Sequence, residues 1–397
     1  MEEKIKIKLE EIVKCVVDGI ENNTIDNTTG LYDGKFGILL FLYYYASYSG
    51  DKKIRAFTDN YAEKISDALW TERIPTFCSG LSGILYVVEF LREQHFIDID
   101  IDDADNDLNH YLIHSMDRFM ANRYYDFMHG ALGIGLYFMK QGKEIKPVLK
   151  LIDFLYDTAE KDPQKKIFKW KSITNMDEGT VGYNIALSHG ISSIVLFLAR
   201  VITNRIEHDK LHDLLEGAVN YLLSQEIDVN LYGSYFPPQS LENENSFIGK
   251  SRLGWCYGDL GVAYSIWYAG KTLGNKGWSD KGMNILINST ERKEVIDNYV
   301  FDAGLCHGSA GIAMVYNRLF LETNSTLFLN AYYYWLELTL MFSTFIDGLA
   351  GYKTFQGSDK ESERDYNLLT GVSGIGLMFV SYLLNNKQKW DELFLLS

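Results

Sequence analysis

Seven short apolar runs recur along the chain, and each follows a pair of small residues spaced three positions apart. The first member of every pair is a glycine: Gly34, Gly80, Gly130, Gly190, Gly258, Gly308 and Gly371. Successive glycines are 46 to 68 residues apart, which is enough chain for two helices and their connections. Recurrence at such a period is typical of repeat architectures. The pattern therefore predicts one structural unit that is used seven times.

Each unit is predicted to contain two kinds of helix. The run after each glycine pair is apolar on nearly every side, whereas the segments between the runs place apolar residues at helical spacing, as at Leu211, Leu215, Ala218 and Leu222. A helix that is apolar all round is buried, and an amphipathic helix covers a core with one face. Hairpins of an inner and an outer helix can close into an all-α (α/α) toroid. We expect residues 1–397 to form a single domain of this kind.

Three segments are longer than a simple hairpin requires. Residues 163–183 contain the run KKIFKWKSI, which predicts a small inserted segment with β-strands. The segments from Val229 to Leu253 and from Lys353 to Arg364 are polar or rich in turn residues, and they are predicted to be loops. Asp347 to Gly351 resembles the repeat motif but lacks the apolar run, so it is also predicted to be a loop.

Charge and composition exclude several classes of protein. The formal net charge of −15 repels nucleic acid, so nucleic acid is not an expected partner. The apolar runs are too short to span a bilayer, and the amino terminus has no signal-peptide pattern. Four cysteines are too few for a disulfide scaffold. We expect a cytoplasmic monomer, which partner proteins could hold at the membrane surface.

Candidate chemistry is concentrated in the two positions before each repeat glycine. Because repeats superpose, residues at equal offsets are expected to gather at one end of the inner helices. These fourteen positions hold three of the chain's four cysteines and three of its eight histidines: Cys78, Cys256, Cys306, His129, His189 and His307. Packing alone does not account for such a concentration, which indicates a functional site.

Cys256 and the pair Cys306-His307 come from neighbouring repeats. Two thiolates and one imidazole form a known ligand set of catalytic zinc, in which the fourth position stays open. We therefore predict one zinc ion per chain at these three residues. Cys78 is interpreted as a core or lining thiol and His129 as a lining histidine.

The motifs Trp255-Cys256-Tyr257-Gly258, Cys306-His307-Gly308 and Ser188-His189-Gly190 resemble, in this order, those of the lanthionine synthetase C family. The resemblance spans the chain from the first repeat to the seventh. It implies the same zinc ligands, Cys256, Cys306 and His307. It also implies that four further residues surround the metal as catalytic residues: His189, Asp126, Arg252 and Tyr257.

The resemblance further implies a lanthipeptide cyclase, which adds peptide cysteine thiols to dehydroalanine or dehydrobutyrine and so forms (methyl)lanthionine thioether rings. A free cysteine has a pKa of about 8.5, and zinc would hold it as the thiolate. His189 would protonate the resulting enolate, Asp126 would orient His189, and Arg252 would stabilise the enolate oxygen or position the peptide. The implied partners are a dehydrated precursor peptide, a dehydratase and an exporter.

Two alternatives keep the toroid and the zinc. One is an enzyme of the same family that uses glutathione or another small thiol in place of a peptide cysteine. The other is a non-catalytic scaffold in which zinc is structural and the protein binds a modified peptide. The presence of His189, Asp126 and Arg252 argues against the scaffold. The strand-containing segment 163–183 and the loop after Asp228 favour a peptide over a small thiol.

Overall fold

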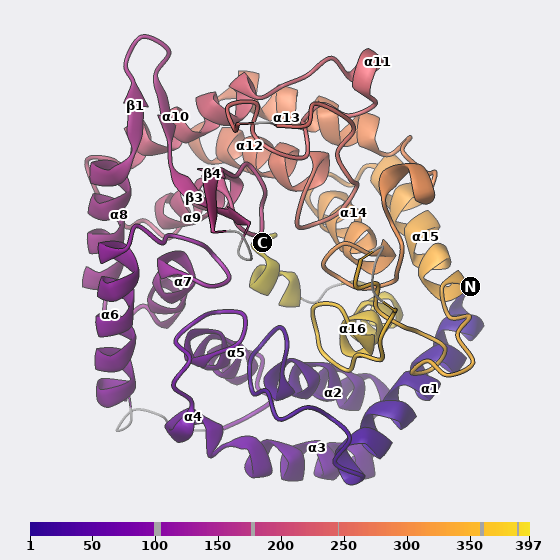
Figure 1. Ribbon diagram of the computed structural model, residues 1–397. Helices are drawn as coiled ribbons and strands as arrows, with labels where there is room; N and C mark the ends of the chain where they lie inside the picture. The colour runs from indigo at the N-terminus through magenta and orange to yellow at the C-terminus, as the bar shows by residue number, and fades with distance from the viewer. Residues whose placement is uncertain (99–104, 176–178, 245, 358–360, 387–388) are drawn as a thin grey trace. The chain divides into compact units, whose positions relative to one another are not determined.

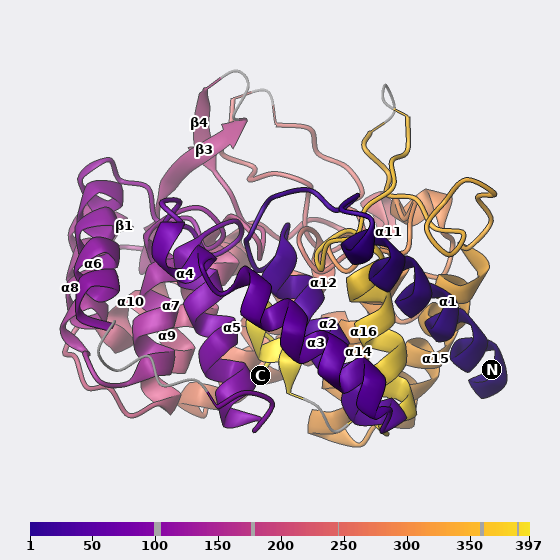
Figure 2. The ribbon, with the colours of Figure 1, turned by 90° about the horizontal axis from the view of Figure 1, so that it is seen from below.

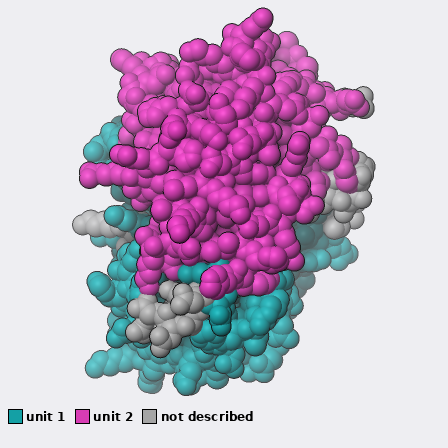
Figure 3. Space-filling model, turned by 90° about the vertical axis from the view of Figure 1, so that its left-hand side faces the viewer, with its two compact units in different colours: residues 1–109, 300–397 teal, residues 110–299 magenta. Residues whose placement is uncertain are grey.

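The computed structural model describes residues 1–397 except 99–104, 176–178, 245, 358–360 and 387–388. The chain divides into two compact units, which Figure 3 colours teal and magenta. Unit 1 comprises residues 1–109 and 300–397, and unit 2 comprises residues 110–299. That the two units form a single domain stays a prediction.

Unit 1 contains four of the inner helices that the glycine pairs predict: α2 (Lys35–Ser49), α5 (Leu81–Glu93), α14 (Ser309–Thr323) and α16 (Val372–Leu383). They pack against one another in the order α14, α16, α2, α5. The outer helices are α1 (Glu2–Glu21) on α16, α3 (Lys52–Ile65) on α2, α15 (Thr326–Met341) on α14 and the short α4 (Ala68–Thr71) on α5 (Figure 1). Helices α3 and α15 follow their inner partners in the sequence. After α16, however, the described chain forms the 3-10 helix η2 (Trp390–Phe394), and α1 is the outer partner of α16.

Unit 2 contains the other three inner helices: α7 (Ala131–Gln141), α9 (Ile191–Thr203) and α12 (Asp259–Leu273). Helix α9 packs between α7 and α12. The outer helices are α8 (Lys146–Thr158) on α7, α10 (Leu211–Ser224) on α9 and α13 (Lys276–Ser289) on α12. Helix α6 (Asp105–Ala121) contains the boundary between the units, and α11 (Val229–Tyr232) and the 3-10 helix η1 (Ile296–Asn298) lie in the long connections of unit 2.

The burial of the two kinds of helix agrees with the sequence pattern. Every residue of α9 from Ile191 to Val201 is buried. The outer helix α3 buries Thr58, Tyr61 and Ile65 and leaves its other residues exposed or half-buried. The inner helices therefore form the core of each unit, and the outer helices cover it with one face.

Each repeat glycine is the N-cap of its inner helix. The second small residue is needed because the helix approaches the preceding loop closely. A Cβ atom on Gly83 or Gly311 would lie 1.9 Å from the carbonyl oxygen of Phe77 or Leu305, respectively. The motif thus joins a tight loop to the start of a buried helix, as the sequence predicts.

Strands β2 (Ile167–Lys169), β3 (Lys171–Asn175) and β4 (Thr180–Tyr183) lie within residues 163–183, for which the sequence predicts strands, and β1 (Glu160–Asp162) directly precedes them. Strand β1 pairs antiparallel with β2, and β3 pairs antiparallel with β4. Ile173 and Val181 are direct partners in the second sheet, and they are 39% and 60% exposed. Figure 2 shows β3 and β4 projecting beyond the helices of unit 2.

The C-terminal segment lies in the core of unit 1. Arg318 of α14 forms a buried bidentate ion pair with Asp391 of η2. The hydroxyl of Tyr32 donates a hydrogen bond of 2.6 Å to the carbonyl oxygen of Leu393, and its ring stacks on Phe394. Residues from both ends of the chain therefore share this core.

Candidate metal centre and catalytic residues

The segment before α12 in unit 2 carries three of the predicted site residues, Arg252, Cys256 and Tyr257. Gly258 ends the segment with a φ of +91°, whereas the other six capping glycines have φ between −98° and −142°. Glycine adopts such positive φ values without the steric cost that a Cβ atom imposes. Gly258 thus permits a backbone turn that the other six repeats do not have. This repeat is the one that carries Cys256, a predicted zinc ligand.

Cys256 and His189 are close neighbours in unit 2. The carbonyl oxygen of Cys256 accepts hydrogen bonds from the backbone N–H groups of Leu187 at 3.0 Å and Ser188 at 3.2 Å. The cysteine itself is buried. The loop before α9 therefore lies beside the loop before α12. His189 directly follows Leu187 and Ser188, which make these hydrogen bonds.

Asp126 holds His189. One carboxylate oxygen, Oδ2, lies 2.8 Å from Nδ1 of His189, and the other, Oδ1, accepts a 2.8 Å hydrogen bond from the backbone N–H of His129. The side chain of Asp126 is 7% exposed, while that of His189 is 30% exposed. The carboxylate is thus fixed at both oxygens, and it engages Nδ1 of His189 rather than Nε2.

Two opposing effects act on the pKa of His189. Burial lowers it, but the hydrogen bond and charge of Asp126, together with the nearby Cys256, raise the pKa above its ordinary value overall. Asp126 therefore favours the imidazolium, which is the form that donates a proton.

Aromatic rings border His189 on two sides. The ring of His129 stacks on it with centroids 5.6 Å apart and an interplanar angle of 13°. The ring of Tyr257 lies 6.3 Å away at 44°, and its hydroxyl accepts a 3.2 Å hydrogen bond from the side-chain amide of Asn184. These contacts restrict the orientation of the imidazole.

Arg252 is half-buried. Within the described part of the chain, its guanidinium makes no hydrogen bond or ion pair. A partly desolvated cation of this kind is suited to bind an anionic or carbonyl oxygen of a substrate.

Cys306 and His307 precede α14 in unit 1. The backbone N–H of Cys306 donates a 2.9 Å hydrogen bond to the carbonyl oxygen of Leu369, and Nε2 of His307 lies 3.2 Å from Oδ2 of Asp302. Asp302 is 3% exposed and accepts backbone hydrogen bonds from Gly304 and Phe355 at 3.0 Å each. Metal-binding histidines are commonly oriented by such a carboxylate.

Cys256, Cys306 and His307 form a group that could hold a metal ion, and their potential ligand atoms all lie within 4.8 Å of one another. The four cysteines, all of which the structure describes, form no disulfide bonds. Two thiols and one imidazole match the donor set of catalytic zinc and leave one coordination position for a water or a substrate. The residues present thus fit zinc. Cys78, which shares the sequence column, is not part of the group.

Asp302 and Asn184 are not among the residues predicted from the sequence. Both stand six positions before a repeat glycine, as does Arg252. This position is structurally equivalent in several repeats, because its carbonyl oxygen accepts a hydrogen bond from the residue after the glycine, at 3.1 Å for Asp302 and 2.8 Å for Asn184. The polar residues six positions before the repeat glycines were the sequence signal from which Asp302 and Asn184 could have been predicted.

Each unit also contains a cavity. In unit 2, a cavity of about 530 Å³ lies between α6 and β3, and its lining includes Phe119, Tyr125, Trp170, Ile173 and Val181. Tyr125 directly precedes Asp126, so this cavity adjoins the predicted catalytic residues.

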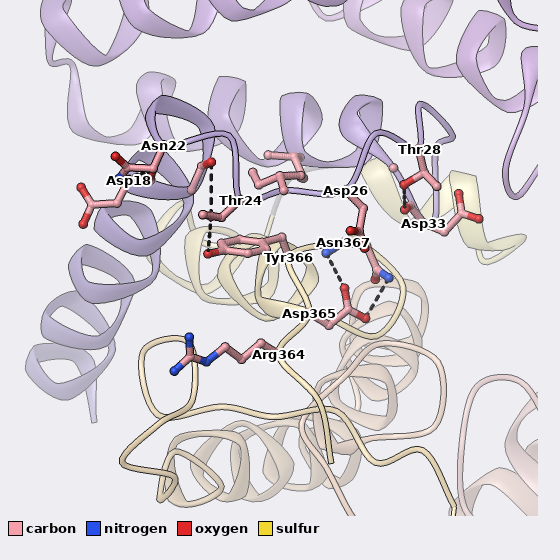
Figure 4. Close-up of a pocket in the computed structure, with 14 residues that line it drawn as sticks. Asp18, Asn22, Thr24, Asp26, Thr28, Asp33, Arg364, Asp365, Tyr366 and Asn367 are labelled. Atoms are coloured by element: carbon pink, nitrogen blue, oxygen red, sulfur yellow. Dashed lines mark hydrogen bonds between the residues drawn. The ribbon is translucent and has the colours of Figure 1, made fainter. Parts of the chain in front are cut away.

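The cavity of unit 1 has a volume of about 390 Å³ and is lined mainly by polar residues (Figure 4). Asp365 accepts hydrogen bonds from Asn367 and Thr370 there, and burial raises the pKa of its carboxyl group. None of the predicted catalytic or metal-binding residues lines this cavity. We therefore assign it no part in the chemistry.

Comparison with known proteins places this chain in a family. The sequence model of the lanthionine synthetase C-like proteins matches residues 26–395. The chain belongs to this family, which confirms the resemblance that the motifs indicate. Among the described residues, each helix is too short or too polar to cross a membrane.

Individual relatives agree with this assignment. Nisin biosynthesis protein NisC of Lactococcus lactis subsp. lactis is 24% identical over 334 residues, which cover 78% of this chain and 77% of that protein. Glutathione S-transferase LANCL1 of Danio rerio is 22% identical over 336 residues, which cover 80% and 76%. A solved structure of nisin cyclase matches 98% of this chain and 97% of its own, with a TM-score of 0.76 and 20% identity. This likeness confirms the predicted fold class, an all-α toroid with a small strand-containing insertion.

Proposed function

We propose that this protein is a zinc-dependent lanthipeptide cyclase, which joins cysteine thiols of a dehydrated precursor peptide to dehydroalanine or dehydrobutyrine. One observation carries the proposal. Cys256, a member of the metal-binding group, is hydrogen-bonded through its backbone to the loop of His189, and His189 is paired with a buried carboxylate. This arrangement supports a site in which a thiol-binding position and a proton donor would act together, as the addition of a thiol to an alkene requires.

Cys256, Cys306 and His307 would hold the zinc ion. Zinc, when bound, would keep the substrate sulfhydryl as the nucleophilic thiolate. Zinc dependence is supported by the donor set and by the buried Asp302 beside His307.

The remaining residues would act on the alkene and its enolate. The sulfur forms a bond to the β-carbon, and the electron pair of the carbon–carbon double bond moves toward the carbonyl oxygen. Arg252 would stabilise the negative charge on that oxygen. His189 would deliver a proton from Nε2 to the α-carbon, while Asp126 keeps Nδ1 protonated. The proton lost by the thiol balances the proton gained by the α-carbon.

A peptide substrate is supported by the cavity of unit 2. Its volume of about 530 Å³ and its aromatic lining suit a side chain of a peptide, and the exposed Ile173 and Val181 extend its apolar surface. A relative named nisin cyclase is consistent with such a substrate.

A second candidate function uses a small thiol such as glutathione as the nucleophile. Its support is the relative named glutathione S-transferase LANCL1, which matches 80% of this chain. The proposed site chemistry is the same in both cases, because either thiol would occupy the open position of the zinc.

The test measures thiol consumption and metal content together. Purified protein is mixed with a dehydrated peptide that contains one cysteine, and the remaining thiol is alkylated and counted by mass spectrometry. We expect ring formation by the wild-type protein, loss of both activity and zinc in Cys306→Ser, and loss of activity with normal zinc in His189→Ala. Cys78→Ser is the matched control, since Cys78 occupies the same sequence column outside the metal-binding group, and we expect it to retain both properties.

Three results would contradict the proposal. One is a zinc-free wild-type protein, another is full activity of His189→Ala, and the third is a reaction that requires added glutathione. The third result would establish the small-thiol alternative.

A further inference from the structure

Arg292, in the connection after α13, is at the centre of a buried polar network in unit 2. Its side chain is 10% exposed. Nε donates a 2.8 Å hydrogen bond to Oδ1 of Asn298, Nη1 lies 3.0 Å from Oδ2 of Asp259, and Nη2 donates to the carbonyl oxygen of Ser251. All three guanidinium nitrogens are therefore bonded to different parts of the chain.

Asp259 is the first residue of α12 and is 1% exposed. Besides the ion pair with Arg292, it accepts hydrogen bonds from the backbone N–H groups of Tyr235 at 3.0 Å and Phe236 at 2.9 Å. Burial raises the pKa of Asp259, while the charge of Arg292 opposes that effect. Removal of Arg292 would leave a buried carboxylate without its counter-ion.

The contacts of Arg292 lie at both ends of one short segment. Ser251 directly precedes Arg252, and Asp259 directly follows Gly258. Asn298 adds a third attachment, because its carbonyl oxygen accepts a 3.0 Å hydrogen bond from the backbone N–H of Leu253. Arg292 thus braces the segment 251–259, which carries Arg252, Cys256 and Tyr257, without being close to these residues in the sequence.

We propose that Arg292 is a positioning residue of the active site, whose guanidinium holds the segment 251–259 in the conformation that presents Arg252 and Cys256. The proposal rests on the function proposed above. Arg292 acts through the segment and does not contact the reacting atoms. The fork of the guanidinium is essential to this role, because a lysine ammonium has one nitrogen and cannot reach three separated acceptors in the same geometry.

The test compares Arg292→Lys with Arg318→Lys. Arg318 is a matched control, since it forms a similarly buried ion pair with Asp391 in unit 1, with side-chain exposures of 9% and 6%. Full-length zinc-loaded proteins are assayed with dehydrated peptide. A general loss of stability would affect both variants alike. We expect kcat to fall at least about 30-fold in Arg292→Lys with KM changed less than about threefold, and both constants to stay near wild type in Arg318→Lys.

A second readout does not depend on turnover. Amide hydrogen exchange of the segment 251–259 is measured in the same proteins, and we expect it to be at least about tenfold faster in Arg292→Lys only. Equal exchange or equal kcat in the two variants would overturn the proposal. Should the wild-type protein fail to cyclise the peptide, the proposed function falls, and hydrogen exchange alone decides the positioning role. If Arg292→Lys does not fold, Asn298→Ala replaces it, because this variant removes one acceptor of the guanidinium and keeps the ion pair with Asp259.

Discussion

Replacement of Asp126 by asparagine is a sharp perturbation of the proposed proton donor, because it changes charge and hydrogen bonding with little change of shape. In the wild type, Oδ1 accepts from the backbone N–H of His129, and Oδ2 accepts from Nδ1 of His189. In Asp126→Asn, the amide oxygen is expected to keep the bond to His129. The amide NH₂ group would then face Nδ1 of His189, which could no longer carry a proton there.

The size of the effect follows from this geometry. The hydrogen bond and the charge of Asp126 raise the pKa of His189, and Asp126→Asn removes both contributions. Burial, which lowers the pKa of His189, would then dominate. Because the acid form is the proton donor, its population at neutral pH falls, and we expect kcat to drop on the order of 10²-fold with little change in KM.

The assay is the pH dependence of kcat for ring formation between pH 5 and 9. In the wild type, kcat falls as pH rises through the elevated pKa of His189, since the proton donor is lost. In Asp126→Asn, this decline moves to lower pH, so the difference between the two proteins is smallest at acidic pH. Asp365→Asn serves as a control, because Asp365 is a half-buried carboxylate that accepts hydrogen bonds from Asn367 and Thr370 and makes no contact with His189. An unchanged pH profile in Asp126→Asn would exclude His189, held by Asp126, as the proton donor.

Three further predictions concern single contacts. Asp302→Asn removes the charge beside His307, and we expect zinc affinity to fall about 10–100-fold in competition with a chelator. Unchanged affinity would exclude a role of Asp302 in orienting His307. Gly258→Ala places a Cβ atom 1.9 Å from the carbonyl oxygen of Arg252 at a φ of +91°. In urea unfolding we expect the free energy of unfolding to fall by at least about 1–2 kcal/mol. A smaller decrease would show that the turn can relax. Asp391→Ala leaves Arg318 buried without its bidentate partner, and we expect the free energy of unfolding to fall by about 3 kcal/mol in the same assay. We expect a normal kcat per folded molecule, and a reduced kcat would contradict a purely structural role of the pair.

Much of the fold is encoded locally and could be predicted from the sequence. An apolar run after a glycine pair can be buried only as an inner helix, and each repeat glycine indeed caps such a helix. The helix covering α16 was not predictable in this way. It is the first helix of the chain, and only the packing of the two chain ends in unit 1 brings α1 onto α16.

The grouping of the potential metal ligands was predictable where repeats superpose. Cys256 and Cys306 stand two positions before a repeat glycine, and His307 stands one position before a repeat glycine. These equivalent positions are visible in the sequence, and the structure brings the three residues together. Asp302 was missed because its function depends on how the preceding loop folds back toward His307. Arg292 was missed for a different reason. Its partner Asp259 begins α12, whereas Arg292 lies in the connection after α13, and the other repeats have no such charged pair at these positions, so only tertiary structure reveals it.

The most direct test of the central claim is X-ray absorption at the zinc edge of the purified protein, with and without a dehydrated peptide that contains one cysteine. We expect two sulfur ligands at about 2.3 Å and light-atom ligands at about 2.0–2.1 Å in the free protein, and a third sulfur ligand when the peptide binds. A coordination shell that stays the same when the peptide is added, or a protein without zinc, would contradict the central claim.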